Sequence, residues 1–297
     1  AANYSISAGQ TTTAHIAPKS LTVSGNTASN KIYDSNSSAT VTVTLSGFVG
    51  SETLTYTNAS SFNNKNVGTG KTVTVNSIML ADGNNGGLAS NYSVTPGQTT
   101  TANIAAKALT ISGITASSKT YDGNTSATLD TSSVLYTGLI SGDTFNGSYS
   151  GAFGNANVGT AKTVTITPSY TGADVSNYDI TDQTSTTADI SAKALTAIAS
   201  VSNKTYDATN FAAATLSISG LVGSETLSAT NTSTFNNKNV GTGKTVTVNS
   251  ITLADGANGG LAANYSISAG QTTTANITAK SLTVSGITAS NKTYDGG

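Results

Sequence analysis

The sequence predicts an all-β protein built from tandem repeats. Thr, Ser, Asn and Gly dominate the 297 residues, while the helix formers Glu, Gln, Arg and Met are scarce or absent. Apolar residues alternate with Thr and Ser over short stretches, a period typical of half-buried strands. Similar segments recur at a fixed spacing, which indicates a repeat architecture.

The repeat length follows from the tetrad Lys-(Ser/Ala)-Leu-Thr, which starts at residues 19, 107, 193 and 280, in steps of 88, 86 and 87. Three complete repeats are therefore predicted, with a partial repeat on each side. We expect the chain to be a window on a longer array, whose partners are further copies of the same repeat. The predicted segments are 1–18 (the C-terminal part of a preceding repeat), 19–106, 107–192, 193–279, and 280–297 (the N-terminal part of a following repeat).

The strands of one repeat can be placed along residues 107–192. Leu109 and Ile111 alternate with hydroxyl residues, and Gly113 ends this strand. A turn at 120–124 follows, then one or two strands in 127–139, and a strand at 145–153 whose internal Asn146-Gly147 leaves a hairpin open. After a turn at 155–159, further strands lie around Val164, Tyr178 and Ala188. Six or seven short strands and no amphipathic helix predict tandem Ig-like β-sandwich domains of about 87 residues, arranged head to tail.

The junctions between repeats are expected to be stiff. An Ile and a Leu stand five residues apart at each one, as at Ile104 and Leu109. An odd separation places two side chains on opposite faces of a continuous strand, so the chain is expected to pass from one domain into the next between them. The remaining linker is too short for a flexible tether, and an extended rod is predicted.

Composition excludes several functions. Only 9% of residues are charged, Arg and Cys do not occur, and His15 is the only histidine. Thiolate chemistry, cysteine-ligated zinc and a basic nucleic-acid surface are ruled out, and we expect no enzyme activity, cofactor, metal or nucleic-acid partner. No apolar run is long enough to span a membrane. A cysteine-free β chain rich in Thr and Ser fits an exported bacterial protein, so an extracellular or cell-surface location is predicted.

The pair Tyr-Asp is the strongest candidate motif. It could bind sugars, because Tyr stacks on sugar rings and Asp accepts their hydroxyls. Alternatively, Tyr fills the domain edge and Asp caps the following turn. Recurrence in every repeat favours this structural role. The motif residues are Tyr33, Asp34, Tyr121, Asp122, Tyr206, Asp207, Tyr294 and Asp295.

Two weaker candidates have simpler explanations. The loops 82–87 and 255–260 have a faint likeness to calcium loops, but each offers one carboxylate where calcium needs six to eight oxygens. Lys71, Asn66 and Glu52, with their counterparts in the other repeats, are the residue types of an isopeptide cross-link. Surface turns and solvated lysines are the favoured interpretation of both.

Spaced motifs resemble one known family. In the second repeat they are 119–123 (Lys-Thr-Tyr-Asp-Gly), 138–143, Asn157-Val-Gly, Asn177-Tyr178 and 193–196. This pattern resembles the YDG-type repeat, similar to MBG repeats, of large bacterial exoproteins and adhesins of the filamentous-haemagglutinin kind. Ser35 and Ala208 stand where the motif has glycine. The resemblance implies a repetitive stalk rather than an activity.

The predicted function is structural. The repeats would form the shaft of a secreted or cell-surface adhesin or extracellular fibre, as a mechanical spacer or a filament building block. The alternative is an adhesion module whose repeats bind glycans or matrix weakly and gain strength by avidity. Low charge leaves lateral or homopolymeric self-association open, and a glycan or a host surface could be bound by a tip outside this segment.

Overall fold

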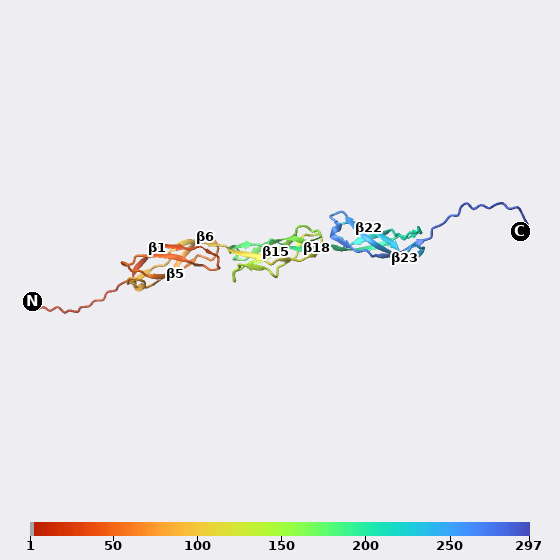
Figure 1. Cartoon of the computed structure of the whole chain (residues 1–297). Coiled ribbons are helices and arrows are strands. Elements are labelled where there is room, and N and C mark those ends of the chain that lie inside the picture. Colours follow the sequence, from red (N-terminus) through yellow and green to blue (C-terminus); the bar gives the residue numbers. More distant parts are fainter. Residues whose placement is uncertain (1–2) are drawn as a thin grey trace. The chain divides into compact units, whose positions relative to one another are not determined.

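The computed structural model describes residues 3–297, so Ala1 and Ala2 of the predicted 1–18 segment lie outside the described residues. The described chain is all-β: it contains strands and three single 3₁₀ turns, and no α-helix. Three similar β units of about 85 residues follow one another along the sequence. Figure 1 labels the principal strands.

Repeat 1 folds into two sheets. The first has the strand order β4-β1-β7, with β1 antiparallel to β4 and parallel to β7, and the second has the order β2-β8-β6-β5-β3. Alternate residues of β4 (Val41, Val43 and Leu45) are buried, as the period of two requires. The elements are β1 Lys19–Ala28, β2 Lys31–Ile32, β3 Ser38–Ala39, β4 Val41–Ser46, β5 Thr55–Phe62, β6 Gly68–Ala81, η1 Ala89–Asn91, β7 Tyr92–Val94 and β8 Thr99–Ala105.

Repeat 2 has the same plan with shorter pieces. Its sheets have the orders β14-β9-β17, β10-β13 and β11-β18-β16-β15-β12. The one or two strands expected in 127–139 are the three pieces β12, β13 and β14. The elements are β9 Lys107–Ser112, β10 Thr115–Ala116, β11 Lys119–Thr120, β12 Ser126–Ala127, β13 Leu129–Asp130, β14 Leu135–Thr137, β15 Asn146–Phe153, β16 Gly159–Thr171, η2 Val175–Asn177, β17 Tyr178–Thr181 and β18 Ser185–Ser191.

The hairpin left open at Asn146-Gly147 does not form, because both residues lie inside the single strand β15. Gly147 serves close packing instead of a turn. A Cβ there would lie 2.8 Å from the Tyr136 hydroxyl and 2.6 Å from that of Tyr149. Glycine inside a strand often marks such a close approach. Around it, Tyr136, Phe145, Tyr149 and Tyr170 form a chain of aromatic contacts with centroid separations from 5.1 to 6.2 Å.

Repeat 3 repeats the plan of repeat 1. Its sheets have the orders β21-β19-β24 and β20-β25-β23-β22. Phe235, Val246 and Ile277 form the centre of a buried cluster in it. The elements are β19 Lys193–Val201, β20 Lys204–Thr205, β21 Ala214–Ser219, β22 Leu227–Phe235, β23 Gly241–Asp255, η3 Ala262–Asn264, β24 Tyr265–Ile267 and β25 Thr272–Thr278.

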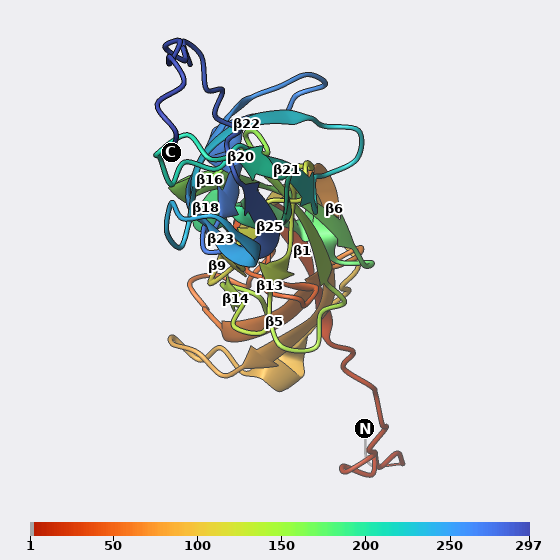
Figure 2. The same ribbon diagram turned by 90° about the vertical axis from the view of Figure 1, so that its right-hand side faces the viewer.

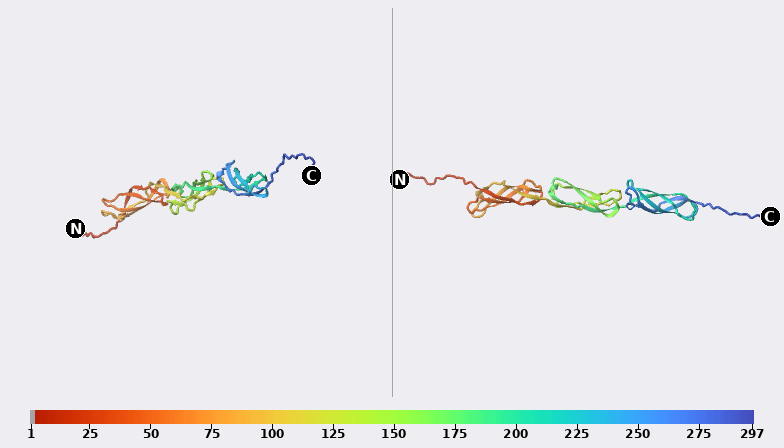
Figure 3. Two further views of the ribbon diagram at one scale, coloured as in Figure 1. Left: turned by 45° about the vertical axis from the view of Figure 1, so that its right-hand side comes forward. Right: turned by 90° about the horizontal axis from the view of Figure 1, so that it is seen from above.

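The segments that flank the three repeats contain no strand. Residues 3–18 and 280–297 are exposed along their length. Figure 2 shows both leaving the strands, and Figure 3 shows them as extended tails. Tyr4 and Tyr294, the counterparts of buried tyrosines in complete repeats, are 93% and 92% exposed. A partial repeat therefore carries the sequence motif without the packing that a complete repeat gives it.

The chain divides into two compact units whose boundaries differ from those of the three sequence repeats. One unit comprises residues 1–113, 132–149 and 168–183, and the other comprises 114–131, 150–167 and 184–297. Each unit thus joins one complete repeat to part of repeat 2. Within the second unit, Ile190 and Leu195 belong to the same buried cluster although they stand on either side of a repeat boundary. Buried packing therefore continues across this boundary, around the point where the chain was expected to pass from one domain into the next.

Candidate functional site

The Tyr-Asp motif begins as a local turn organised by a lysine. In each repeat a Lys three residues before the Asp donates its amino group to that carboxylate, as in Lys31–Asp34 at 2.7 Å. Asp34 also accepts the backbone N–H of Asn36 at 3.2 Å, which closes a turn of the Asx type. The lysine lies over an aromatic ring, 5.5 Å from the centroid of Phe62. The same arrangement recurs at Lys119–Asp122 and Lys204–Asp207.

The tyrosine of the motif points away from this turn and into the next repeat. Within the first unit, Tyr33 is 1% exposed and its hydroxyl donates to Asp174 Oδ1 at 3.2 Å. Its ring meets Tyr178 edge to face, with the centroids 5.6 Å apart. Tyr and Asp of one dipeptide therefore have separate roles. The tyrosine bonds to the start of the following repeat, and the aspartate shapes the turn at the end of its own.

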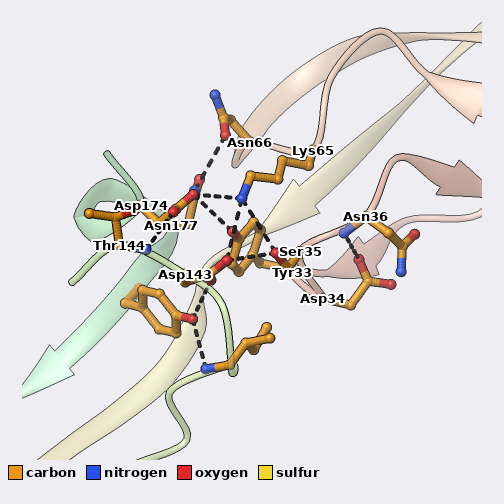
Figure 4. A network of polar contacts seen from close by, with 12 residues as sticks. Tyr33, Asp34, Ser35, Asn36, Lys65, Asn66, Asp143, Thr144, Asp174 and Asn177 are labelled. Carbon is orange, nitrogen blue, oxygen red and sulfur yellow. Dashed lines mark hydrogen bonds and ion pairs between the residues drawn. The ribbon is translucent and has the colours of Figure 1, made fainter. Parts of the chain in front are cut away.

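The amino group of Lys65 in repeat 1 lies beside Tyr33 and forms ion pairs with two carboxylates of repeat 2. Lys65 Nζ lies 2.7 Å from Asp174 Oδ1 and 3.3 Å from Asp143 Oδ1, and both carboxylates are almost fully buried. Ser35 donates its hydroxyl to Asp143 at 2.6 Å. Figure 4 shows how these side chains converge from both repeats. We call the contributions of repeat 1 (Tyr33, Ser35, Lys65, Asn66 and Val67) its end face, and those of repeat 2 (Ile140, Asp143, Asp174, Asn177 and Tyr178) its start face.

Electrostatics follow from these contacts. The hydrogen bond from Lys65 and that from the Thr144 N–H hold the pKa of Asp174 below its ordinary value. Burial acts to raise the pKa of Asp143, but hydrogen bonds from Ser35 and Tyr178 outweigh it and leave that pKa lowered. The carboxylates in turn raise the pKa of Lys65. At neutral pH the network therefore holds one cation between two anions.

Backbone groups are also satisfied across the repeat boundary. The N–H of Val67 donates to Asn177 Oδ1 at 3.0 Å, and the Asn177 amide donates back to Asn66 Oδ1 at 3.4 Å. Asn177 is 1% exposed, so its side chain bridges the repeats in the interior. On the start face, Tyr178 donates to Asp143 Oδ2 at 2.6 Å and accepts the Ile140 N–H at 3.0 Å.

An equivalent junction joins repeats 2 and 3 within the second unit. Tyr121 donates to Glu225 Oε1 at 2.6 Å and Tyr265 donates to Glu225 Oε2 at 2.5 Å. The two rings meet edge to face with centroids 5.4 Å apart. The N–H of Val158 donates to Asn264 Oδ1 at 3.0 Å, as Val67 does to Asn177. Burial and the bond to Glu225 raise the pKa of Tyr121 to about 12.

The start of repeat 1 and the end of repeat 3, which have no complete neighbouring repeat among residues 3–297, show each half of the junction alone. At the start of repeat 1, Tyr92 already donates to Glu52 Oε2 at 2.6 Å, while Val49 is half exposed. At the end of repeat 3, Tyr206 is only partly buried and Val240 is 54% exposed. The start face is therefore assembled without its partner, whereas the end face gains its burial from the repeat that follows.

Sequence reasoning identified some of these residues and missed others. It singled out the Tyr-Asp pairs, of which the structure places Tyr33 and Tyr121 in junctions, Tyr206 on an end face and Tyr294 in a tail. It missed the bridging role of Asn177 and Asn264 and the partners of the tyrosines. Their signal was present, since Asn-Tyr recurs with the same period as Tyr-Asp.

The weaker candidates have ordinary structural partners. Asp82 and Asp255 accept the N–H groups of Ala89 and Ala262, at 2.7 and 2.8 Å, so each carboxylate caps its own loop. No group of three His, Cys, Asp or Glu side chains suited to a metal occurs within residues 3–297. The cross-link candidates are engaged separately: Lys71 donates to Asn64 at 2.7 Å, while Glu52 accepts from Tyr92.

Two comparisons with known proteins bear on the chain. A search of individually curated proteins finds no match. No helix among the described residues has the length and apolar character needed to cross a membrane. The YDG domain family matches three consecutive segments, residues 17–102, 105–187 and 191–275. Because these segments cover most of the sequence, the chain belongs to the YDG domain family, of which it carries three tandem repeats.

Proposed function

We propose that the chain is a structural shaft in a bacterial secreted or cell-surface adhesin or extracellular fibre. Its repeats, Ig-like β-sandwiches in this proposal, act as mechanical spacers or filament building blocks. The observation that carries the proposal is the junction. At both junctions a buried tyrosine and a backbone N–H of one repeat are bonded to a carboxylate and an asparagine of the next. Such contacts hold neighbours in a fixed relation, which a spacer requires.

The backbone at the junctions supports this proposal. Strand β8 ends at Ala105 and β9 begins at Lys107, and β18 ends at Ser191 before β19 begins at Lys193. A single residue between strands leaves no flexible tether. Load applied along the chain would therefore pass directly from one strand into the next, and the interlocking side chains would resist bending.

A glycan- or matrix-binding module acting by avidity is the alternative function, and the aromatic residues disfavour it. Sugar-binding surfaces present aromatic rings outward, whereas Tyr33, Tyr121 and Tyr178 point into junctions and are nearly fully buried. An open hollow of about 470 Å³ lies between β21 and β22. Its lining consists of aliphatic and polar residues without an aromatic ring.

Small-angle scattering tests the shaft proposal on the intact chain. With a rise of about 3.3 Å per strand residue, each repeat is expected to advance roughly 35–40 Å, so three repeats give a maximum dimension on the order of 110 Å before the tails are added. A maximum near 60 Å, or a flexible-chain profile, would contradict the proposal. Saturable binding to a glycan or matrix array that survives Tyr33→Phe would instead support the alternative function.

A further inference from the structure

The two junctions of this chain use different chemistry at the same positions. At the end face, Lys65 of repeat 1 corresponds to Ala156 of repeat 2 and Lys238 of repeat 3. At the start face, the residue before the 3₁₀ turn is Asp174 in repeat 2 and Leu261 in repeat 3. The end face with Lys65 therefore meets the start face with Asp174. The end face with Ala156 meets the start face with Leu261.

The charged junction depends on both partners. Asp143 and Asp174 place two buried carboxylates on one start face, and Lys65 is the cation that lies between them. Buried charges are tolerated when they are paired and hydrogen-bonded, and removal of one partner from such a pair is strongly destabilising. An alanine end against this start would leave the two carboxylates without a cation.

The junction between repeats 2 and 3 offers a lysine one carboxylate instead of two. That carboxylate, Glu225, already accepts hydrogen bonds from Tyr121 and Tyr265. Leu261 stands where an aspartate would be needed to hold a second charge. A lysine in place of Ala156 would lose hydration and would meet one carboxylate, whereas Lys65 pairs with two.

A second position distinguishes the same two junctions independently. Ser35, Gly123 and Ala208 are equivalent and all have positive φ, of 65°, 79° and 69°. A Cβ on Gly123 would lie 2.9 Å from Val222 Cγ1 of the following repeat. At the charged junction the side chain of Ser35 is accommodated, and its hydroxyl reaches Asp143. A Cβ at this position is therefore accommodated at the first junction, whereas at the second it would require Val222 to shift.

We propose that the YDG repeats of this chain carry two matched pairs of faces, which determine which repeat can follow which. The end face of repeat 3 has Ala208 and Lys238, and so matches the end of repeat 1 at both positions. Its partner is a start face with the aspartate pair, such as that of a second copy of repeat 2, and not the glutamate–leucine start of repeat 3. The inference concerns the order of repeats and stands independently of the shaft function.

Substitutions in the full chain test whether the residues at positions 156 and 261 must match each other. Ala156→Lys should lower the melting temperature of the second unit, and adding Leu261→Asp should restore at least half of the loss. Lys238→Ala, at an end face without a partner in this chain, is the matched control and should leave both units unchanged. If the effects of Ala156→Lys and Leu261→Asp simply add, the two positions are not coupled and the proposal is overturned.

Extension of the chain gives a second test that does not depend on a destabilised variant. Residues 280–297 are replaced either by a copy of residues 107–192 or by a copy of residues 193–279. Hydrogen exchange of the Val240 N–H reports docking, since its counterparts Val67 and Val158 are bonded across junctions. We expect at least tenfold greater protection with the repeat 2 copy, a difference of about 1.4 kcal/mol. Equal protection in the two chains would overturn the proposal.

The reciprocal variant makes this test specific. Ala208→Gly combined with Lys238→Ala converts the end of repeat 3 into the repeat 2 type. In the extended chains this variant should reverse the preference, with the Val240 N–H better protected by the copy of 193–279. An unchanged preference for the repeat 2 copy would mean that other residues determine the pairing, and would refute the assignment of these two positions.

Discussion

Removal of one hydroxyl at a junction should weaken the folded unit measurably. In Tyr121→Phe the ring keeps its edge-to-face contact with Tyr265, but Glu225 Oε1 loses the donor that lies 2.6 Å away. A hydrogen bond to a charged group contributes about 1.5–3 kcal/mol. For a unit of this size each kcal/mol corresponds to about 2–4 °C. We therefore expect the second unit to melt roughly 3–12 °C lower.

Thermal unfolding followed by calorimetry measures this shift, and the chain supplies a matched control. Tyr206 occupies the same place in repeat 3, and its hydroxyl makes no hydrogen bond within residues 3–297. A change of this kind typically stays within about 0.5 kcal/mol, so Tyr206→Phe should shift the transition by no more than about 2 °C. Equal shifts for the two variants would show that the tyrosine contributes only to its own repeat, and would refute the interlocking role of the junction.

Three further outcomes are expected. Below about pH 4 the first unit should lose stability, because Asp143 and Asp174 have lowered pKa values and bind fewer protons folded than unfolded; a melting temperature constant from pH 6 to pH 3 would contradict this. Gly256→Ala should cost at least about 2 kcal/mol in urea unfolding, because its Cβ would lie 2.0 Å from the Thr226 carbonyl oxygen, whereas Gly154→Ala, with open space around it, should stay within about 0.5 kcal/mol. Millimolar calcium should change neither melting transition, since binding to the loop 255–260 would stabilise the native state and raise the melting temperature.

Local patterns in the sequence were sufficient to predict the strands. Val41, Val43 and Leu45 alternate with Thr and become the buried side of β4, and the fixed period locates three repeated β units. The strand expected at 145–153 forms as β15, and the hairpin that Asn146-Gly147 left open does not. Asn-Gly is a strong hairpin signal, but here the glycine makes room for the hydroxyls of Tyr149 in the same strand and of Tyr136 in β14.

The junction could be predicted only in part, because its contacts join positions that are far apart. Val67 and Asn177 are separated by 110 residues, and Val158 and Asn264 by 106. Tyr-Asp and Asn-Tyr each recur along the sequence, but recurrence does not show that they meet. Lys65 and Asp174 were harder still, since neither recurs in all repeats and each resembles drift when the repeats are aligned with one another. Their relation appears only when the end of one repeat is compared with the start of the next.

The difference between the two faces has a consequence for arrays of any length. A start face forms its own Tyr92–Glu52 hydrogen bond, while an end face leaves Val240 exposed and Tyr206 partly open until another repeat arrives. During synthesis from the N-terminus, the most recently folded repeat would always be the incomplete one. However many repeats are joined, only one such surface remains. The tendency to associate through it should therefore depend on the number of chains rather than on their length, and a single terminating segment that covers it would be enough to keep even a very long array from sticking to others.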